Sequence, residues 1–99
     1  MQHEYAGILD ALLQVGEVEE ALSFCDRVIR ELPPEISAYA YFTKGRILIR
    51  RYDERAIELI YQAIENNSNL IQNGLDEIGY FCCLIGNRAE LERYRKMAD

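Results

Sequence analysis

Apolar residues recur at intervals of three and four along almost the whole chain. No stretch alternates between apolar and polar residues in the two-residue rhythm of a half-buried strand. Near the start of the chain, Tyr5, Ile8 and Leu12 follow this spacing, which places them on one face of an α-helix. The sequence therefore predicts an all-α fold.

Turn-forming residues divide this pattern into six short helices. Gly16 is expected to end the first helix and Pro33 and Pro34 the second, while Ser37 is the expected N-cap of the third. The predicted helices span about residues 2–15, 18–32, 37–51, 53–66, 70–85 and 88–97. Short turns between them predict three antiparallel hairpins, of about residues 2–34, 37–68 and 70–98, within a single domain spanning residues 1–99.

The hairpins also repeat in sequence. Gly16 recurs as Gly86, a separation of 70 residues, and half of that shift, 35 residues, places Ala21 on Ala56. The same 35-residue shift maps further apolar residues of the second helix onto apolar residues of the fourth: Leu22 onto Ile57, Cys25 onto Ile60, Val28 onto Ala63 and Ile29 onto Ile64. A unit of about 35 residues therefore occurs three times.

This unit resembles the tetratricopeptide repeat, a helix pair of about 34 residues with a small residue where its two helices touch. The places that match the family are Tyr5, Ile8, Gly16, Ala21 and Pro33 in the first unit, Gly45, Ala56 and Ala63 in the second, and Ile78, Gly79 and Gly86 in the third. The second unit lacks the turn glycine and is one residue short at 49–53, so an irregular turn is expected there. The resemblance implies three hairpins stacked as a short right-handed superhelix.

In that family, the first helix of each unit lines the inner, concave face of the stack. Carrying those places over gives a candidate partner-binding face of Asp10, Leu13, Phe42, Arg46, Ile49, Arg50, Asp76 and Tyr80, with Ala6, Gln14, Cys83 and Leu84 beside them. The resemblance implies an apolar floor of Phe42, Ile49 and Tyr80. Arg46 and Arg50 would then receive a partner's carboxylate, and the two aspartates would receive a basic side chain.

Simpler interpretations of these residues stay open. Leu13, Ile49 and Leu84 are also expected if they pack between adjacent hairpins. Arg46 and Arg50 are also expected on a solvated face, in weak surface ion pairs. The basic cluster of Lys44, Arg46, Arg50, Arg51 and Arg55 is interpreted as a solvated turn diluted by Asp53, Glu54 and Glu58, with phosphate or acidic lipid as the alternative ligand. The neighbours Asp76 and Glu77 are interpreted as solvated helix charges.

Charge and composition exclude several classes of function. The net charge is −6, and residues 1–35 hold eight acids against two bases, which disfavours nucleic acid as a partner. No apolar run is long enough to predict membrane insertion, and the first residues lack the features of a signal peptide, so a cytoplasmic protein is expected. Three cysteines without metal-site spacing predict free thiols and neither metal nor cofactor. The sequence shows no catalytic motif, so no enzyme activity is expected.

These observations favour a protein-interaction module or scaffold that binds a peptide or helix of a partner along the concave face. A second hypothesis is a structural homodimer formed through the first hairpin, near Tyr5, Ile8 and Leu12. A third is an accessory repeat domain of a larger protein, since the third unit resembles the helical-repeat tails of some bacterial membrane-linked zinc peptidases.

Overall fold

The computed structural model describes residues 4–85 and residue 96, and all regular structure within them is helical. The elements are α1 (Glu4–Gln14), α2 (Val18–Glu31), α3 (Pro34–Arg50), α4 (Arg55–Asn66), the 3-10 turn η1 (Ser68–Leu70) and α5 (Ile71–Ile85). The prediction of an all-α fold is therefore confirmed for this part of the chain. The predicted helix over residues 88–97 lies, except for residue 96, outside the described residues.

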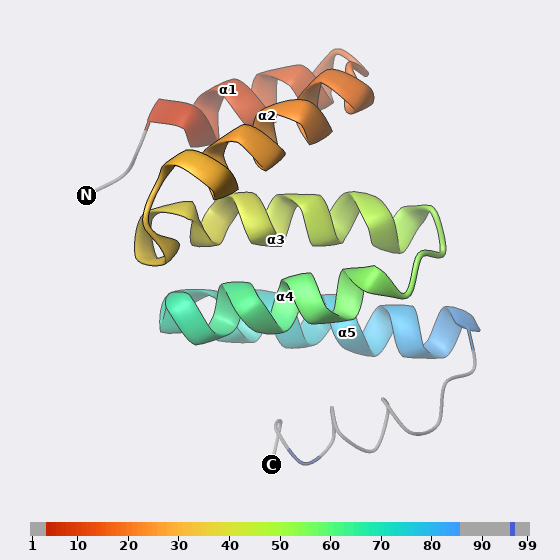
Figure 1. Cartoon of the computed structure of the whole chain (residues 1–99). Helices are drawn as coiled ribbons and strands as arrows, with labels where there is room; N and C mark the ends of the chain where they lie inside the picture. The colour runs from red at the N-terminus through yellow and green to blue at the C-terminus, as the bar shows by residue number, and fades with distance from the viewer. Residues whose placement is uncertain (1–3, 86–95, 97–99) are drawn as a thin grey trace.

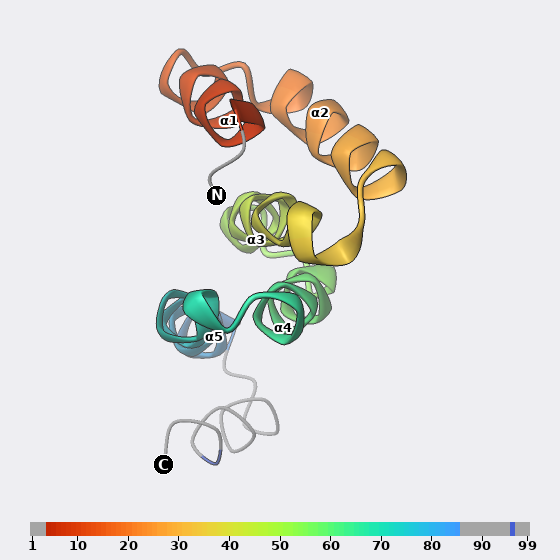
Figure 2. The same cartoon turned by 90° about the vertical axis from the view of Figure 1, so that its left-hand side faces the viewer.

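Consecutive helices run in opposite directions and form two rows (Figures 1 and 2). α1, α3 and α5 lie in one row and α2 and α4 in the other, as Figure 2 shows. The middle helix, α3, contacts each of the other four α-helices, and its most extensive contact is with α4. We call the face formed by α1, α3 and α5 the inner row.

Helix α3 holds the molecule together because it contributes side chains to two separate cores. Its Ala40 and Ile47 belong to a core with α1 and α2, whereas its Leu48 and Ile49 belong to a second core with α4 and α5. A helix that is apolar on opposite faces is stable only when both faces are covered. Helices α1 and α2 cover one face, and α4 and α5 cover the other.

The start of α3 differs from the prediction, because Ser37 is not its N-cap. The helix begins three residues earlier, at Pro34, with Pro33 in an extended conformation before it. Proline is tolerated in the first helical turn, where its missing N–H would have no partner within the helix. Ser37 is instead buried inside the helix, and its hydroxyl donates a hydrogen bond of 3.4 Å to the carbonyl of Pro34.

The turns that end α1 and α3 have the same hydrogen bonds although only one contains glycine. After α1, the amides of Gly16 and Glu17 donate to the carbonyls of Leu13 and Leu12. After α3, the amides of Tyr52 and Asp53 donate to the carbonyls of Ile49 and Leu48 in the same pattern, that of a Schellman motif. The residue in the left-handed region is Gly16, with φ 84°, in the first turn and Tyr52, with φ 58°, in the second. The irregularity expected at 49–53 is thus a tyrosine in a conformation that favours glycine.

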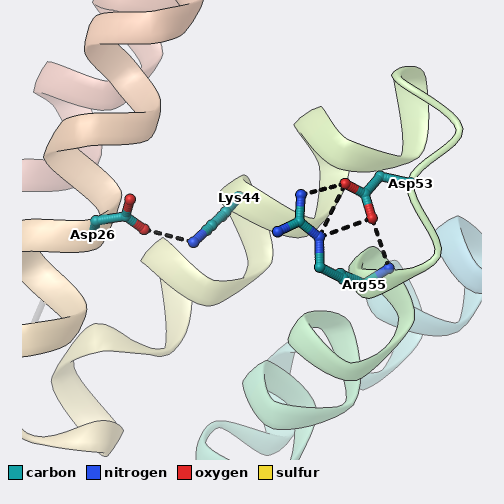
Figure 3. Close-up of polar contacts among 4 residues, drawn as sticks. All are labelled: Asp26, Lys44, Asp53 and Arg55. Atoms are coloured by element: carbon teal, nitrogen blue, oxygen red, sulfur yellow. Dashed lines mark hydrogen bonds and ion pairs between the residues drawn. The ribbon is translucent and has the colours of Figure 1, made fainter.

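Helix α4 begins at Arg55, two residues after the predicted start. The Asp53 side chain accepts hydrogen bonds from the first residue of this helix. A carboxylate oxygen of Asp53 accepts a hydrogen bond of 3.0 Å from the Arg55 backbone N–H, and the Arg55 guanidinium donates to both carboxylate oxygens (Figure 3). These side-chain bonds first, and the backbone bond second, lower the pKa of Asp53 to about 2. Asp53 is therefore ionised at neutral pH, where a negative charge suits a helix start.

Two glycines allow the helices after α2 to approach closely. A Cβ atom on Gly45 of α3 would lie 2.5 Å from Ile60 Cδ1 and 3.3 Å from the backbone oxygen of Ala56, both on α4. A Cβ atom on Gly74 of α5 would lie 2.6 Å from Ile64 Cδ1, also on α4. Gly7 of α1, by contrast, has nothing within 4 Å of that position.

This difference predicts opposite effects for the same substitution. Gly45→Ala gains helix propensity but overpacks the contact with α4, so the free energy of unfolding should fall by about 1 to 2 kcal/mol. Gly7→Ala gains propensity in open space, so the free energy of unfolding should rise by about 0.5 to 1 kcal/mol. Urea denaturation of both variants measures the two changes. A Gly45→Ala variant at least as stable as the original chain would contradict the close contact.

Candidate functional site

Two adjoining hollows lie between the first hairpin and the C-terminal half of α3. The first has a volume of about 350 Å³ and is lined by Leu13, Val18, Arg46, Ile47, Arg50 and Arg51. The second has a volume of about 320 Å³ and is lined by Asp10, Leu13, Gln14 and Arg46. Leu13 and Arg46 line both hollows, so the two adjoin, and we call them together the α1–α3 hollow.

The first part of this hollow has an apolar floor and a basic rim. Leu13 and Val18 are half-buried and Ile47 is almost fully buried, so aliphatic surface forms the floor. The other three lining residues are arginines from the last turns of α3 and the residue after it. Such a site suits a ligand that combines an apolar group with hydrogen-bond acceptors.

Two of these arginines share one carboxylate on α5. Arg46 Nε lies 3.9 Å from Glu77 Oε1, and Arg50 Nη1 lies 3.6 Å from Glu77 Oε2. The Glu77 side chain is only 19% exposed, against 58% for Arg50. These separations are ion-pair distances, longer than hydrogen bonds. The pairs join α3 to α5 within the inner row.

Further contacts hold the side chains of Arg46 and Arg50. Its guanidinium carbon lies 5.4 Å from the centroid of the Phe42 ring, at cation–π distance. Arg50 Nη1 donates a hydrogen bond of 3.0 Å to the Arg46 carbonyl. Arg46 and Arg50 are therefore held one helical turn apart, with both guanidinium groups at the rim of the same hollow.

At the other end of the hollow, Asp10 is held by a tyrosine of α3. Tyr39 Oη donates a hydrogen bond of 2.9 Å to Asp10 Oδ1. Burial first, and this hydrogen bond second, raise the pKa of Tyr39, so the phenol stays a neutral donor. The Tyr39 ring lies between those of Tyr5 and Phe42, with centroid separations of 6.5 and 6.2 Å. This contact ties α1 to α3.

Four of the eight predicted partner-binding residues meet at this hollow. They are Asp10, Leu13, Arg46 and Arg50, and the neighbouring place Gln14 joins them. Each came from the first helix of its predicted unit. The structure thus brings these inner-row places of the first two hairpins together.

The other four predicted residues lie elsewhere. Ile49 is fully buried in the core with α4 and α5, as the alternative of packing between hairpins expects. Phe42 is buried beneath Arg46. Ile49 and Phe42 are therefore not part of an accessible floor. On α5, Asp76 accepts a hydrogen bond of 3.1 Å from Gln72 Nε2 and Tyr80 is exposed, but neither lines the hollow.

Sequence reasoning missed Val18, Ile47, Arg51 and Glu77. Glu77 was expected to be a solvated helix charge, and the structure corrects this, since it is largely buried between two arginines. The register of the repeat pointed to Asp76. Because neighbouring side chains on a helix point about 100° apart, Glu77 faces a different direction from Asp76. Val18 lies on α2, the second helix of the first unit. The prediction assigned the inner face to the first helix of each unit and so did not include α2.

Every cation in the predicted basic cluster has an acidic partner. Lys44 Nζ lies 2.6 Å from Asp26 Oδ1 of α2 (Figure 3), and Arg51 pairs with Glu19 of the same helix. Arg55 pairs with Asp53, and Arg46 and Arg50 pair with Glu77. Asp53 is one of the three acids that the sequence suggested, whereas Asp26, Glu19 and Glu77 come from other helices. The cluster therefore links helices together.

The apolar surface expected on the first hairpin is smaller than predicted. Tyr5 is buried, and its hydroxyl donates a hydrogen bond of 2.6 Å to the Ile36 carbonyl. Leu12 is half-buried. Ile8 remains 47% exposed, and Val15, one residue past α1, is 73% exposed.

The cysteines are free thiols, with Cys25 and Cys82 buried and Cys83 exposed. Burial raises the pKa of Cys25 to about 12, which keeps that thiol protonated and unreactive. Among residues 4–85 and 96, no group of three or more His, Cys, Asp or Glu side chains could hold a metal ion. Over the same residues, no helix has the length and hydrophobicity to cross a membrane.

The Glu77 pairs predict a specific loss of stability. Glu77→Gln keeps the side-chain shape but leaves two neighbouring guanidinium groups without a counter-charge, so the free energy of unfolding should fall by about 1 to 2 kcal/mol. The matched control is Glu31→Gln, which removes the exposed i,i+4 pair with Arg27 and should cost less than about 0.5 kcal/mol. Urea denaturation at low and high salt measures both. Equal effects of the two substitutions would show that Glu77 is an ordinary surface charge.

Comparison of the chain with protein-family models, with curated proteins and with solved structures gives no match in any of the three. The α1–α3 hollow is therefore interpreted from its own shape and charge.

Proposed function

We propose that this chain is a protein-interaction module that binds a peptide or helix of a partner protein along its inner row. The proposal includes the finer architecture that the repeat implies, a short right-handed stack of hairpins similar to tetratricopeptide repeats. The single observation that carries it is the α1–α3 hollow, a depression with an apolar floor in the row that such a stack uses for binding.

The chemistry of the lining groups supports binding. The hollow offers aliphatic surface, guanidinium donors, one amide and one carboxylate, which together can recognise the side chains of a peptide. Its residues come from two consecutive hairpins, so the stacking of hairpins creates the site.

The test is capture of a partner with matched variants. Arg46→Gln plus Arg50→Gln removes two of the three positive charges of the rim, and Arg27→Gln plus Arg30→Gln removes two exposed charges on α2. The original chain and the α2 variant should capture the same partner from a cell extract. The rim variant should bind that partner at least about 10-fold more weakly, a loss of about 1.4 kcal/mol.

Circular dichroism on each variant separates loss of binding from loss of fold. Equal affinity of the folded rim variant for the same partner would remove the inner row as the binding face.

Self-association is a second candidate, and the exposure of Ile8 and Val15 favours it. In that case the chain forms a homodimer through α1 and the following turn. Sedimentation at micromolar concentration distinguishes the two candidates, because only the homodimer persists without an added partner.

A further inference from the structure

We infer that the segment recognised by the α1–α3 hollow is acidic and amphipathic: a peptide whose large apolar side chain enters the hollow while a carboxylate one helical turn away meets Arg46 and Arg50. This inference rests on the proposed function and specifies the chemistry of the partner.

The charges around the hollow favour an acidic ligand. Three arginines line its first part, and the acids paired with them are Glu77, shared by two of the arginines, and Glu19. The ion pairs of the first part thus hold three positive charges against two negative charges, and the third acid of the hollow, Asp10, lies in the second part. The local excess in the first part contrasts with the net charge of −6 of the whole chain.

The arginines also retain the capacity to donate hydrogen bonds. A guanidinium carries five N–H donors. Arg46 and Arg50 lie 3.9 and 3.6 Å from the Glu77 oxygens, beyond hydrogen-bond distance, and Arg50 uses Nη1 for the Arg46 carbonyl. Arg50 is 58% exposed, so its donors can reach a ligand. A peptide carboxylate can therefore accept hydrogen bonds from these groups while Glu77 stays in place behind them.

The floor requires an apolar side chain beside that carboxylate. A cavity of about 150 Å³ can hold benzene, so a hollow of about 350 Å³ has room for one large aliphatic or aromatic side chain over Leu13, Val18 and Ile47. A free phosphate or a phosphodiester backbone would leave this floor uncovered. The floor thus favours a peptide over an inorganic or nucleic-acid anion.

The layout of the hollow suggests the spacing between the two peptide side chains and the side on which the acidic one lies. Residues three or four apart on a helix lie about 5 to 6 Å apart, a spacing that lets one enter the hollow while the other reaches the rim. Asp10 lies in the adjoining part of the hollow and would repel a second carboxylate. The acidic residue of the peptide therefore lies on the α3 side.

Selection from a library of random 12-residue peptides, displayed on phage and exposed to the immobilised chain, tests this specificity. Enriched peptides should contain Leu, Ile, Met or Phe with Asp or Glu three or four residues away. For a synthetic copy of an enriched peptide, replacing its acid by the amide should weaken binding at least about 5-fold, roughly 1 kcal/mol.

Protein variants locate the contact. Arg50→Gln should weaken the affinity for the same peptide at least about 5-fold. Changing the acid of the peptide to the amide should then have little further effect on the affinity of this variant. The matched control Arg27→Gln, on α2, should leave the affinity within about 2-fold of the original. Methyl resonances of Leu13, Val18 and Ile47 should shift on addition of the peptide.

Two outcomes would overturn the inference in distinguishable ways. Enrichment of basic or uncharged apolar peptides that shift the same methyl resonances would contradict the acidic specificity and leave the proposed function standing. Failure to enrich any peptide, or enrichment of peptides that shift none of these resonances and bind the Arg50→Gln variant equally, would contradict both proposals. Displacement of a bound acidic peptide by millimolar inorganic phosphate would assign the rim to a simple anion and likewise overturn the inference.

Discussion

The burial of α3 on opposite faces is the constraint on which the rest of the structure depends. One face joins the core with α1 and α2, the other joins the core with α4 and α5, and among the helices that the structure describes no other contributes to both cores. Gly45 brings α3 close to α4 because it has no Cβ. Since neither face can be left exposed without a large loss of apolar burial, α1 and α2 cover one face of α3 while α4 and α5 cover the other.

The candidate site follows from that arrangement. With two faces of α3 covered, the strip that remains lies in the inner row, and Arg46 and Arg50 occupy it one helical turn apart. Glu77 of α5 anchors both guanidinium groups, while Leu13 of α1 provides part of the adjacent floor. The hollow therefore depends on the relative position of three helices. Loss of any packing contact of α3 should change its shape.

Much of the fold could be predicted from apolar periodicity, because that pattern records which faces are buried. The turn at Gly16 was expected because glycine adopts the left-handed conformation easily. The inner-row places Asp10, Leu13, Arg46 and Arg50 were carried over from the family that the repeat resembles. The start of α3 could not be predicted in the same way, since Pro34 can either break a helix or begin one. Glu77 was missed because its role depends on the direction of its side chain. A degenerate repeat can be aligned one residue too early or too late, so it did not distinguish Glu77 from Asp76.

Native-state amide hydrogen exchange tests most directly whether α3 holds the two cores together. Amides in the central turns of α3, such as those of Ile47 and Ile49, should exchange only through global unfolding, with an opening free energy equal to that from urea denaturation. Amides of α1, which covers one edge of the array, should open at a lower free energy. Exchange of the α3 amides through a local opening easier than that of α1 would contradict the central role of this helix.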